Sequence, residues 1–600
     1  MASSNTSAYA KQGRRYRVTH TIAVLAAIRC GPGPSGASKH TTVMLSKPPG
    51  PTHGTHPLST ALFWTVILAG LLLRGLHFDQ QLLLDDEWHA IHQLLGDRSP
   101  GQLLLSFGSA DYSIPLTLLY GLMSHSIGLS EPLMKLPLLL AGALTLILFS
   151  LWARRAYGPT TGLLFAFMLS WSPMLLIYGW TARPYALTLL LAYCALWCFE
   201  RWWCRPDAAR LAAAGFVLLA ALASWLHPLV GPFLLGPFCY CGIIAWLRSD
   251  WSACKRLLLL GACYGALSAV LLLPPLIADF QALASKAGNA EITGQTLLGV
   301  WYFWLGMEQW PATVLLLLLA LTGLPQVLRG SLIVRMALSG LLLTALALAI
   351  TQPAWAQHPV TLGRYLLPTL PLLLLAIAGS LSQIWGWLRR QPLAGSGMGI
   401  TAMVAVLLWL PSQSVLPDLL RWPNTQRSHA VFQFALMPGP NPIVAYQRDR
   451  LARSDFWQQL ARQSPDDSMV AVGPFYFESY NWDAVRWEQD SARRIRPLML
   501  ADFCAGQRPG EVPANPRFRF RNAVYPEHLE WAGEQPAWVV LTKPFEGYAH
   551  GREQVPVGAA VYRSCRQKLE ALLGAADYED QALIAFRVLS ETPTGDKPES

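Results

Sequence analysis

The chain has too few charged residues to cover the surface of a water-soluble protein. Only 14% of its 600 residues are Asp, Glu, Lys or Arg, whereas 53% are hydrophobic. Soluble domains carry roughly 25% charged residues. The composition therefore excludes collagen-like, coiled-coil and disordered classes for the whole chain, and it predicts a polytopic membrane protein.

Motifs for nucleotide-driven chemistry are also missing. The sequence has no phosphate loop, no G-x-G-x-x-G after a strand and no H-E-x-x-H, which disfavours ATP-powered transport by this chain alone. Its ten cysteines do not form a disulfide framework, because seven lie in the apolar region from Cys194 to Cys263. Cys504 and Cys565 lie in a late polar segment, and they are candidates for a disulfide if that segment is extracytoplasmic.

Acidic residues are absent from positions 1–57, which are rich in Gly, Pro, Ser and Thr and hold seven Lys or Arg. The apolar stretch Ile22–Ile28 is too short to span a bilayer. We interpret 1–57 as a disordered, basic cytoplasmic tail, and translation could start at either Met1 or Met44.

From residue 58 to residue 417, apolar stretches recur near the ~20-residue length of a membrane-spanning helix. We count eleven, at 58–76, 133–152, 160–179, 184–203, 208–226, 228–247, 257–278, 311–328, 332–350, 365–388 and 397–416. The sequence therefore predicts a polytopic α-helical membrane domain of about eleven transmembrane helices over 58–417.

Basic residues are scarce in every second break between these stretches. The breaks on one side hold twelve Lys or Arg, whereas the short breaks on the other side hold only Arg183, Lys286 and Arg364. This is the positive-inside pattern, and it predicts a cytoplasmic N-terminus and an extracytoplasmic C-terminus. The net charge of +10 is thus a topology signal and gives no reason to expect nucleic acid as a partner. A bacterial inner membrane, with a periplasmic C-terminal domain, is the expected location.

Two large segments are expected on the outer side. The first extracytoplasmic loop, 77–132, is rich in acidic residues. The tail, 418–600, alternates amphipathic stretches such as Asp449–Gln463 and Arg566–Leu573 with apolar runs at Ser468–Val472, Ala537–Leu541 and Leu583–Leu589. Helices interleaved with strands predict a small extracytoplasmic α/β domain.

An acidic run follows the first predicted span. Asp85, Asp86 and Glu87 precede His89 and His92. A carboxylate beside a membrane-facing cleft can act as general base on an acceptor hydroxyl. The alternative, which the isolated run favours, is an acidic, solvated interfacial helix. On a helix, Asp85, His89 and His92 share one face, so they could also hold a divalent metal. No other cofactor is indicated.

Two outer breaks each carry an arginine beside tyrosine. Arg183 precedes Tyr185 in the break between the third and fourth spans, and Arg364 precedes Tyr365 in a break that also contains His358. A guanidinium can bind phosphate oxygens in a bidentate manner. The alternative is an ordinary interfacial anchor, since Arg, Tyr and Trp all populate the membrane interface. His227, in the shortest outer turn, is interpreted as structural.

The order and spacing of these motifs resemble the GT-C glycosyltransferases of family 39. The resemblance includes protein O-mannosyltransferases, the bacterial lipid A aminoarabinose transferase and RgtA/B/C/D-like enzymes. It covers about residues 60–390 and rests on five segments: Asp86-Glu87-x-His89, Asp111-Tyr-Ser-Ile-Pro115-Leu116, Ser130-Glu-Pro-Leu-Met-Lys135-Leu-Pro137, Leu169-Ser-Trp-Ser-Pro173 with Ala182-Arg183-Pro-Tyr185, and Arg364-Tyr365-Leu-Leu-Pro368. Three residues depart from the family pattern, namely Ile114, Lys135 and Leu138.

The resemblance implies a GT-C fold and inverting transfer of a hexosyl or pentosyl group from a polyprenyl-phosphate sugar. The acceptor would be a lipid, glycan or protein on the extracytoplasmic face. Asp86 would be the general base, Glu87 and Asp111 would orient the acceptor or tune Asp86, and the donor phosphate would be bound by Arg183, Tyr185, His358, Arg364 and Tyr365. The alternatives are a membrane oligosaccharide polymerase or ligase, and a flippase for lipid-linked sugars, which would need ionisable groups at mid-membrane.

Overall fold

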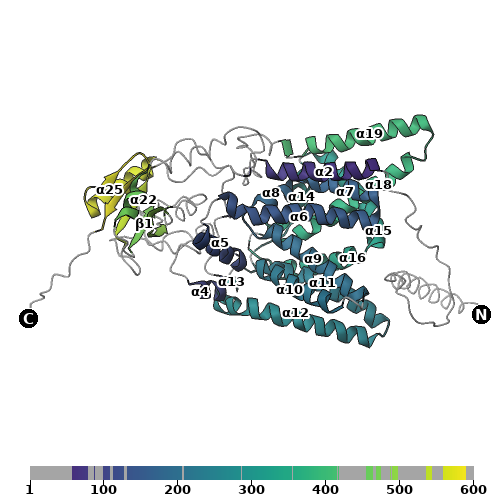
Figure 1. Cartoon of the computed structure of the whole chain (residues 1–600), viewed down its shortest axis with the longest axis horizontal. Helices are drawn as coiled ribbons and strands as arrows, with labels where there is room; N and C mark the ends of the chain where they lie inside the picture. The colour runs from purple at the N-terminus through teal and green to yellow at the C-terminus, as the bar shows by residue number, and fades with distance from the viewer. Residues whose placement is uncertain are drawn as a thin grey trace, which may run out of the picture.

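The computed structural model contains a helical bundle and, at one end of it, a small β-sheet (Figure 1). The structure describes residues 57–76, 99–107, 113–127, 131–205, 209–284, 287–288, 290–307, 309–354, 356–414, 416–417, 454–463, 468–473, 491–497, 536–543 and 559–588, together with Phe78, Glu87, Trp487 and Asp490.

Each of the eleven apolar stretches is largely helical. The helices in these stretches are α2 (Pro57–Gly75), α6 (Glu131–Tyr157), α7 (Pro159–Trp171), α8 (Pro173–Trp180), α9 (Tyr185–Cys204), α10 (Ala209–Leu226), α11 (Gly231–Leu247), α12 (Trp251–Ala278), α15 (Trp310–Gly330), α16 (Leu332–Thr351), α18 (Leu370–Leu388) and α19 (Leu393–Ser412).

The number of helices that can cross a membrane is smaller than predicted. Within the part of the chain that the structure describes, six helices are long and apolar enough, or seven if the bent pair α7–α8 is one span. The stretches Ser59–Gly75, Arg210–Leu226 and Gly397–Ser412 are apolar but shorter. The chain thus has several helices of the kind that an integral membrane protein requires, while the count of eleven is not confirmed.

Further helices lie outside the eleven apolar stretches or at their edges. They are α4 (Pro100–Leu105), α5 (Ile114–Ser126), α13 (Phe280–Ala284), α14 (Gly294–Leu305), α17 (Pro359–Tyr365), and the 3-10 helices η4 (Pro228–Val230) and η5 (Leu367–Thr369). Figure 1 places α4, α5 and α13 at the end of the bundle that faces the sheet. Asp279, at the end of α12, accepts hydrogen bonds from the Ser106 hydroxyl and the Phe107 N–H, which ties the first loop to the bundle.

The stretch predicted as one span at 160–179 is two helices. α7 ends at Trp171 and α8 begins at Pro173, with a bend of 55° between them. In an α-helix the carbonyl of residue i accepts from the N–H of residue i+4, so the Leu169 carbonyl would need an N–H at position 173. Proline has none, and its ring clashes with the preceding turn. Pro173 therefore accounts for the break.

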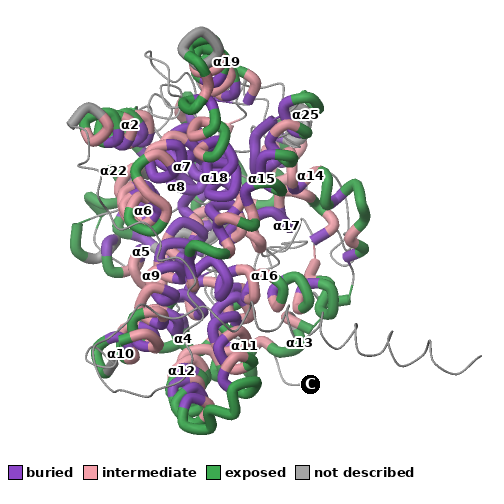
Figure 2. Tube along the Cα trace, turned by 90° about the vertical axis from the view of Figure 1, so that its right-hand side faces the viewer, coloured by how far each residue is buried: buried purple, intermediate pink, exposed green. Residues whose placement is uncertain are grey.

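Burial is greatest in the centre of the bundle. Figure 2 shows α7, α8 and α18 mostly buried, whereas α12 and α19 expose one side. Glycines allow close helix contacts here: a Cβ on Gly340 of α16 would lie 2.1 Å from the Phe233 carbonyl oxygen of α11, and one on Gly323 of α15 would lie 1.9 Å from the Ala376 oxygen of α18. Larger residues at these two glycines would push the paired helices apart.

The C-terminal part contains a five-stranded sheet in the order β2-β1-β3-β5-β4. β1 (Met469–Gly473) pairs in parallel with β2 (Arg494–Pro497) and β3 (Trp538–Thr542), whereas β5 (Leu583–Arg587) runs antiparallel to β3 and β4 (Tyr578–Glu579). Three of the strands were expected from the apolar runs. α22 (Phe456–Arg462) lies within the amphipathic stretch Asp449–Gln463, and α25 (Ala559–Leu573) contains the stretch Arg566–Leu573 and begins before it. Residues 418–453 lie outside the described residues, so the domain boundary stays a prediction.

Buried apolar residues connect this sheet with the end of the bundle. One continuous cluster contains Phe107 and Ile114 of the first loop together with Phe456, Trp457 and Val470 of the C-terminal part. The first loop and the sheet therefore share a core, and burial of these apolar side chains stabilises their contact.

Glu579 gives this part of the chain a dependence on pH. Hydrogen bonds from Lys543 and Arg566 hold the pKa of Glu579 below its usual 4.5. Because the folded pKa is lower than the unfolded one, the stabilisation is complete above the unfolded value and is lost as the pH falls through the folded value. The carboxylate is 38% exposed, so we expect Glu579→Gln to cost less than about 1 kcal/mol at neutral pH. The measurement is the temperature at which a protease begins to cleave the C-terminal part in wild type and in the variant. The two temperatures should differ at neutral pH and become equal in acid. A difference that stays the same at all pH values would contradict this assignment.

Candidate functional site

A buried ion pair joins the first loop to the bundle. Both carboxylate oxygens of Glu87 contact the Lys135 ammonium of α6, at 3.0 and 3.1 Å, and both residues are almost fully buried. The Ala182 N–H donates to the same carboxylate at 2.5 Å. Buried charges require such partners. Glu87 thus lies directly against Ala182, the residue that precedes Arg183.

Two arginines from distant parts of the chain meet at one tyrosine. The guanidinium carbon of Arg183 lies 5.9 Å from the centre of the Tyr185 ring, and that of Arg364 lies 5.7 Å from it. Tyr185 begins α9 and is buried, whereas both arginines are partly exposed. An arginine this close to an aromatic ring gains a cation–π attraction. The arrangement concentrates two positive charges beside the first residue of α9.

Further aromatic rings complete the cluster. Tyr178, on α8, lies 5.1 Å from Tyr185 between ring centres, and His227 lies 5.4 Å from Tyr185 and 5.8 Å from Tyr365. We call Tyr178, Arg183, Tyr185, His227, Arg364 and Tyr365 the arginine–aromatic cluster. It draws on α8, the turn between α8 and α9, α9 itself, the turn between α10 and η4, and α17.

Hydrogen bonds fix the backbone that carries these side chains. The Trp304 indole of α14 donates to the Gly363 carbonyl at 3.0 Å, and the Tyr193 hydroxyl of α9 donates to the Pro368 carbonyl at 2.7 Å. Both bonds are buried. The first bond holds α17 against α14, and the second holds η5, which follows α17, against α9. Arg364 lies between these two fixed points of the chain. Gly363 is required here, because a Cβ would lie 2.6 Å from the Phe303 ring.

The negative charge of Glu87 also acts on a tyrosine of the first loop. Burial, with a further contribution from Glu87, raises the pKa of Tyr120 on α5 well above its usual value, whereas Arg183 opposes that shift. The Tyr120 hydroxyl donates to the Met134 carbonyl at 3.0 Å. Tyr120 is thus a neutral donor that packs the first loop onto α6, within the electrostatic reach of both Glu87 and Arg183.

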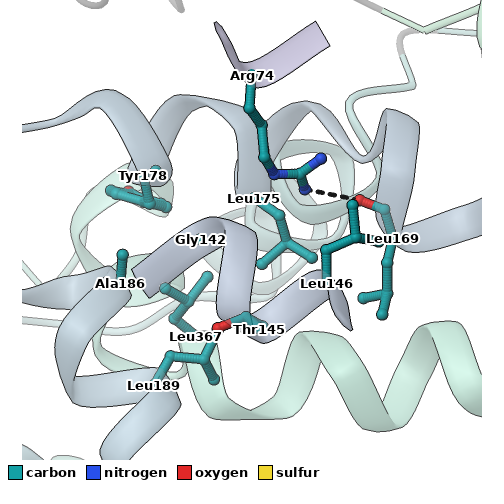
Figure 3. Close-up of a pocket in the computed structure, with 11 residues that line it drawn as sticks. Arg74, Gly142, Thr145, Leu146, Leu169, Leu175, Tyr178, Ala186, Leu189 and Leu367 are labelled. Atoms are coloured by element: carbon teal, nitrogen blue, oxygen red, sulfur yellow. Dashed lines mark hydrogen bonds between the residues drawn. The ribbon is translucent and has the colours of Figure 1, made fainter. Parts of the chain in front are cut away.

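Arg74, near the end of α2, is fully buried beside the bend between α7 and α8. Its guanidinium donates to the carbonyls of Gly70 at 2.9 Å, Ser170 at 3.2 Å and Leu169 at 2.9 Å. Figure 3 shows the bond to Leu169 and a mainly apolar cavity that extends from Arg74 towards Tyr178 and Ala186. Arg74 therefore supplies the donor that Pro173 cannot give to the Leu169 carbonyl.

The predicted site residues have different outcomes. Arg183, Tyr185, Arg364 and Tyr365 lie together in the arginine–aromatic cluster, and their role as phosphate ligands stays a prediction. His358 is exposed at the opposite end of α17 from Arg364, about 9 Å further along at 1.5 Å per residue. The other predicted residues lie outside the described part of the chain: Asp85, Asp86, His89, His92, Asp111 and Cys504.

Metal and disulfide predictions also remain open. Among the described residues, no group of three His, Cys, Asp or Glu could hold a metal ion, and the metal candidates Asp85, His89 and His92 are not among them. Cys565 on α25 is disulfide-bonded. Because Cys504 lies outside the described residues, its pairing with Cys565 stays a prediction.

Three residues near the site are not predicted as site residues from the sequence. His227 is interpreted there as structural, Lys135 is only a departure from a motif, and Arg74 has no assigned role. A single charged residue near the end of an apolar span is the one local signal that Arg74 offers. Lys135 and Glu87 are 48 positions apart, so only tertiary packing identifies them as a pair.

No protein-family model matches the sequence, and no curated protein matches it. Solved structures with a similar fold include ArnT from Cupriavidus metallidurans bound to undecaprenyl phosphate, with 16% identity and a TM-score of 0.47 over 89% of this chain and 98% of that one. The Archaeoglobus fulgidus oligosaccharyltransferase has 11% identity and a TM-score of 0.42, over 80% and 68% of the two chains. The arabinofuranosyltransferase AftD from Mycobacteria has 16% identity and a TM-score of 0.43, over 85% and 37%. At these identities and TM-scores, the similarities assign no activity to this chain.

Proposed function

We propose that this protein is a membrane glycosyltransferase of the GT-C type that moves a hexosyl or pentosyl group from a polyprenyl-phosphate donor to an acceptor. The observation that carries the proposal is the convergence of Arg183 and Arg364 on Tyr185. Two guanidinium groups at the end of an apolar bundle suit a ligand that has a phosphate head and a hydrocarbon tail. The reaction would take place on the extracytoplasmic face of a bacterial inner membrane.

The contacts of Glu87 support the choice of Asp86 as the base. Asp86 directly precedes Glu87 in the sequence, and the Glu87 carboxylate accepts from the N–H of the residue before Arg183. Successive Cα atoms are about 3.8 Å apart, so a base at position 86 is compatible with a site that includes the Arg183 segment. In this proposal Glu87 is a positioning residue. Its two oxygens bind Lys135 and the backbone, and it orients the loop that carries Asp86.

The chemistry is an in-line displacement at the anomeric carbon. Asp86 takes the proton of the acceptor hydroxyl while that oxygen forms the new bond to the sugar. The bond between the sugar and the phosphate oxygen breaks, and its electron pair leaves with the lipid phosphate. The phosphate gains negative charge in this step, and Arg183 and Arg364 stabilise that charge. No strong general acid is required, because a phosphate monoester is a good leaving group once its developing charge is stabilised.

The test uses membranes that contain the full chain and are supplied with polyprenyl-phosphate sugars. We expect Asp86→Asn to lower sugar transfer by at least about 100-fold, as loss of a general base does. Arg183→Ala with Arg364→Ala should weaken binding of the donor lipid. The matched control is Arg155→Ala, at an exposed arginine in the last turn of α6. Near-wild-type transfer by folded Asp86→Asn would refute the mechanism, and undiminished donor binding by the double arginine variant would refute the phosphate site.

A further inference from the structure

His227 occupies a fixed position in the outer turn between α10 and η4. Its backbone N–H donates to the Ala223 carbonyl at 3.0 Å, and its own carbonyl accepts from the Val230 N–H at 3.0 Å. Pro228 follows it and restricts the backbone further. The imidazole is partly exposed. The backbone of His227 is therefore held by the fold at this position, and the residue is accessible from outside the protein.

The imidazole lies between the two tyrosines that flank the arginines. Tyr185 is beside the guanidinium groups of both Arg183 and Arg364, and Tyr365 is the next residue after Arg364. The His227 ring is tilted by 52° to the Tyr185 ring and by 50° to the Tyr365 ring. The donors of an imidazole lie in the plane of its ring. The tilted His227 ring is therefore not stacked face to face on either tyrosine. In a face-to-face stack, a histidine would contribute packing alone.

We propose that His227 is a third ligand of the donor phosphate, which donates a ring N–H to an oxygen that Arg183 and Arg364 also bind. This inference rests on the proposed function. Imidazole carries at least one N–H in either protonation state, so the interaction does not require a charged histidine. Three segments that are far apart in the sequence would then surround one phosphate: residues 181–185, the turn at 227–230, and α17.

The position of His227 predicts which kinetic step it supports. In the donor the phosphate is a diester with one negative charge, and it leaves as a monoester with more charge. A donor N–H that binds this phosphate therefore gains strength as the bond to the sugar breaks. Loss of the N–H should lower kcat more than it raises KM, and it should also weaken inhibition by the free polyprenyl phosphate that is released.

The test compares two substitutions that separate hydrogen bonding from packing. His227→Phe keeps an aromatic ring between the tyrosines and removes the N–H, whereas His227→Gln removes the ring and keeps a donor. We expect His227→Phe to lower kcat by about 10- to 100-fold, somewhat less than the loss of an oxyanion-hole donor, and His227→Gln to retain most of the activity. Near-wild-type kcat for His227→Phe, or equal loss in both variants, would overturn the proposal. Thermal unfolding of each variant in detergent confirms that the compared proteins are folded.

A second measurement separates this inference from the proposed function. Binding of a polyprenyl phosphate without sugar is measured for wild type, His227→Phe and Arg183→Ala. Weaker binding by both variants supports the phosphate site with His227 as a ligand. Weaker binding by Arg183→Ala alone refutes the role of His227 and leaves the proposed function standing. Absence of binding by wild type refutes the proposed function and, with it, the inference.

Discussion

Glu87→Ala should destabilise the folded protein by about 3–5 kcal/mol and abolish activity, because it leaves a buried ammonium group without its carboxylate. Lys135 is 4% exposed and contacts both oxygens of Glu87. The Ala182 N–H loses its acceptor in the same substitution. The expected result is a large fall in the thermal unfolding temperature of the detergent-solubilised protein, together with loss of the ordered turn that carries Arg183.

A double substitution distinguishes charge burial from the positioning role. Replacing a buried ion pair by apolar residues is often neutral or stabilising, so Glu87→Ala with Lys135→Met should recover most of the lost stability. Sugar transfer should not recover, because the Ala182 N–H is still without its acceptor. The control is Glu570→Ala, whose exposed i,i+4 pair with Arg566 contributes only about 0.3–0.5 kcal/mol. A double variant that regains full transfer would show that Glu87 does not position the loop.

Arg74→Met should be the second most damaging substitution. It removes the donors to three buried carbonyls, including the Leu169 carbonyl that Pro173 leaves without a helical partner. An unsatisfied buried polar group costs about 1–3 kcal/mol. Because α8 leads from the bend to Tyr178 and then to Arg183, a shift of α8 should also raise KM for the donor. Unfolding temperature and donor KM are the measurements, and Arg329→Met, at an exposed arginine near the end of α15, is the control.

A second substitution in the bend, Pro173→Ala, tests whether Arg74 acts through the Leu169 carbonyl. Pro173→Ala restores an N–H at the position from which the Leu169 carbonyl would accept in a continuous helix. In the Arg74→Met background, Pro173→Ala should therefore recover part of the lost stability. Recovery of donor binding is not expected, because the substitution also favours a straighter helix. If Pro173→Ala lowers the stability of Arg74→Met further, then Arg74 does not compensate for the missing proline N–H.

The sequence predicts the elements of this fold better than it predicts the contacts between them. Apolar length identifies the helices, and short apolar runs identify β1, β3 and β5, because burial of these stretches depends on local composition. The bend at Ser172 was missed, since hydropathy over 160–179 is continuous and only Pro173 marks the break.

In the candidate site, too, the sequence predicts single residues better than the contacts between them. Arg183 and Arg364 are conspicuous as rare basic residues in breaks that the positive-inside pattern keeps poor in charge. His227 carries no such signal. Its neighbours Tyr185 and Tyr365 are 42 and 138 positions away, so its place in the cluster depends on how α9, α10 and α17 pack. Lys135 became recognisable only through its partner Glu87.

The ion pair between Glu87 and Lys135 also sets the smallest unit of this chain that can be exchanged in a chimera. Glu87 belongs to the first loop, Lys135 to α6, and Ala182 to the turn before α9. A graft of the loop 77–132 alone would carry Glu87 and leave both of its partners, Lys135 and Ala182, behind. A working exchange of this loop between proteins of this fold therefore requires the continuous block from Arg74 to Tyr185, which keeps both the bond of Arg74 to Leu169 of α7 and the bond of Glu87 to Ala182.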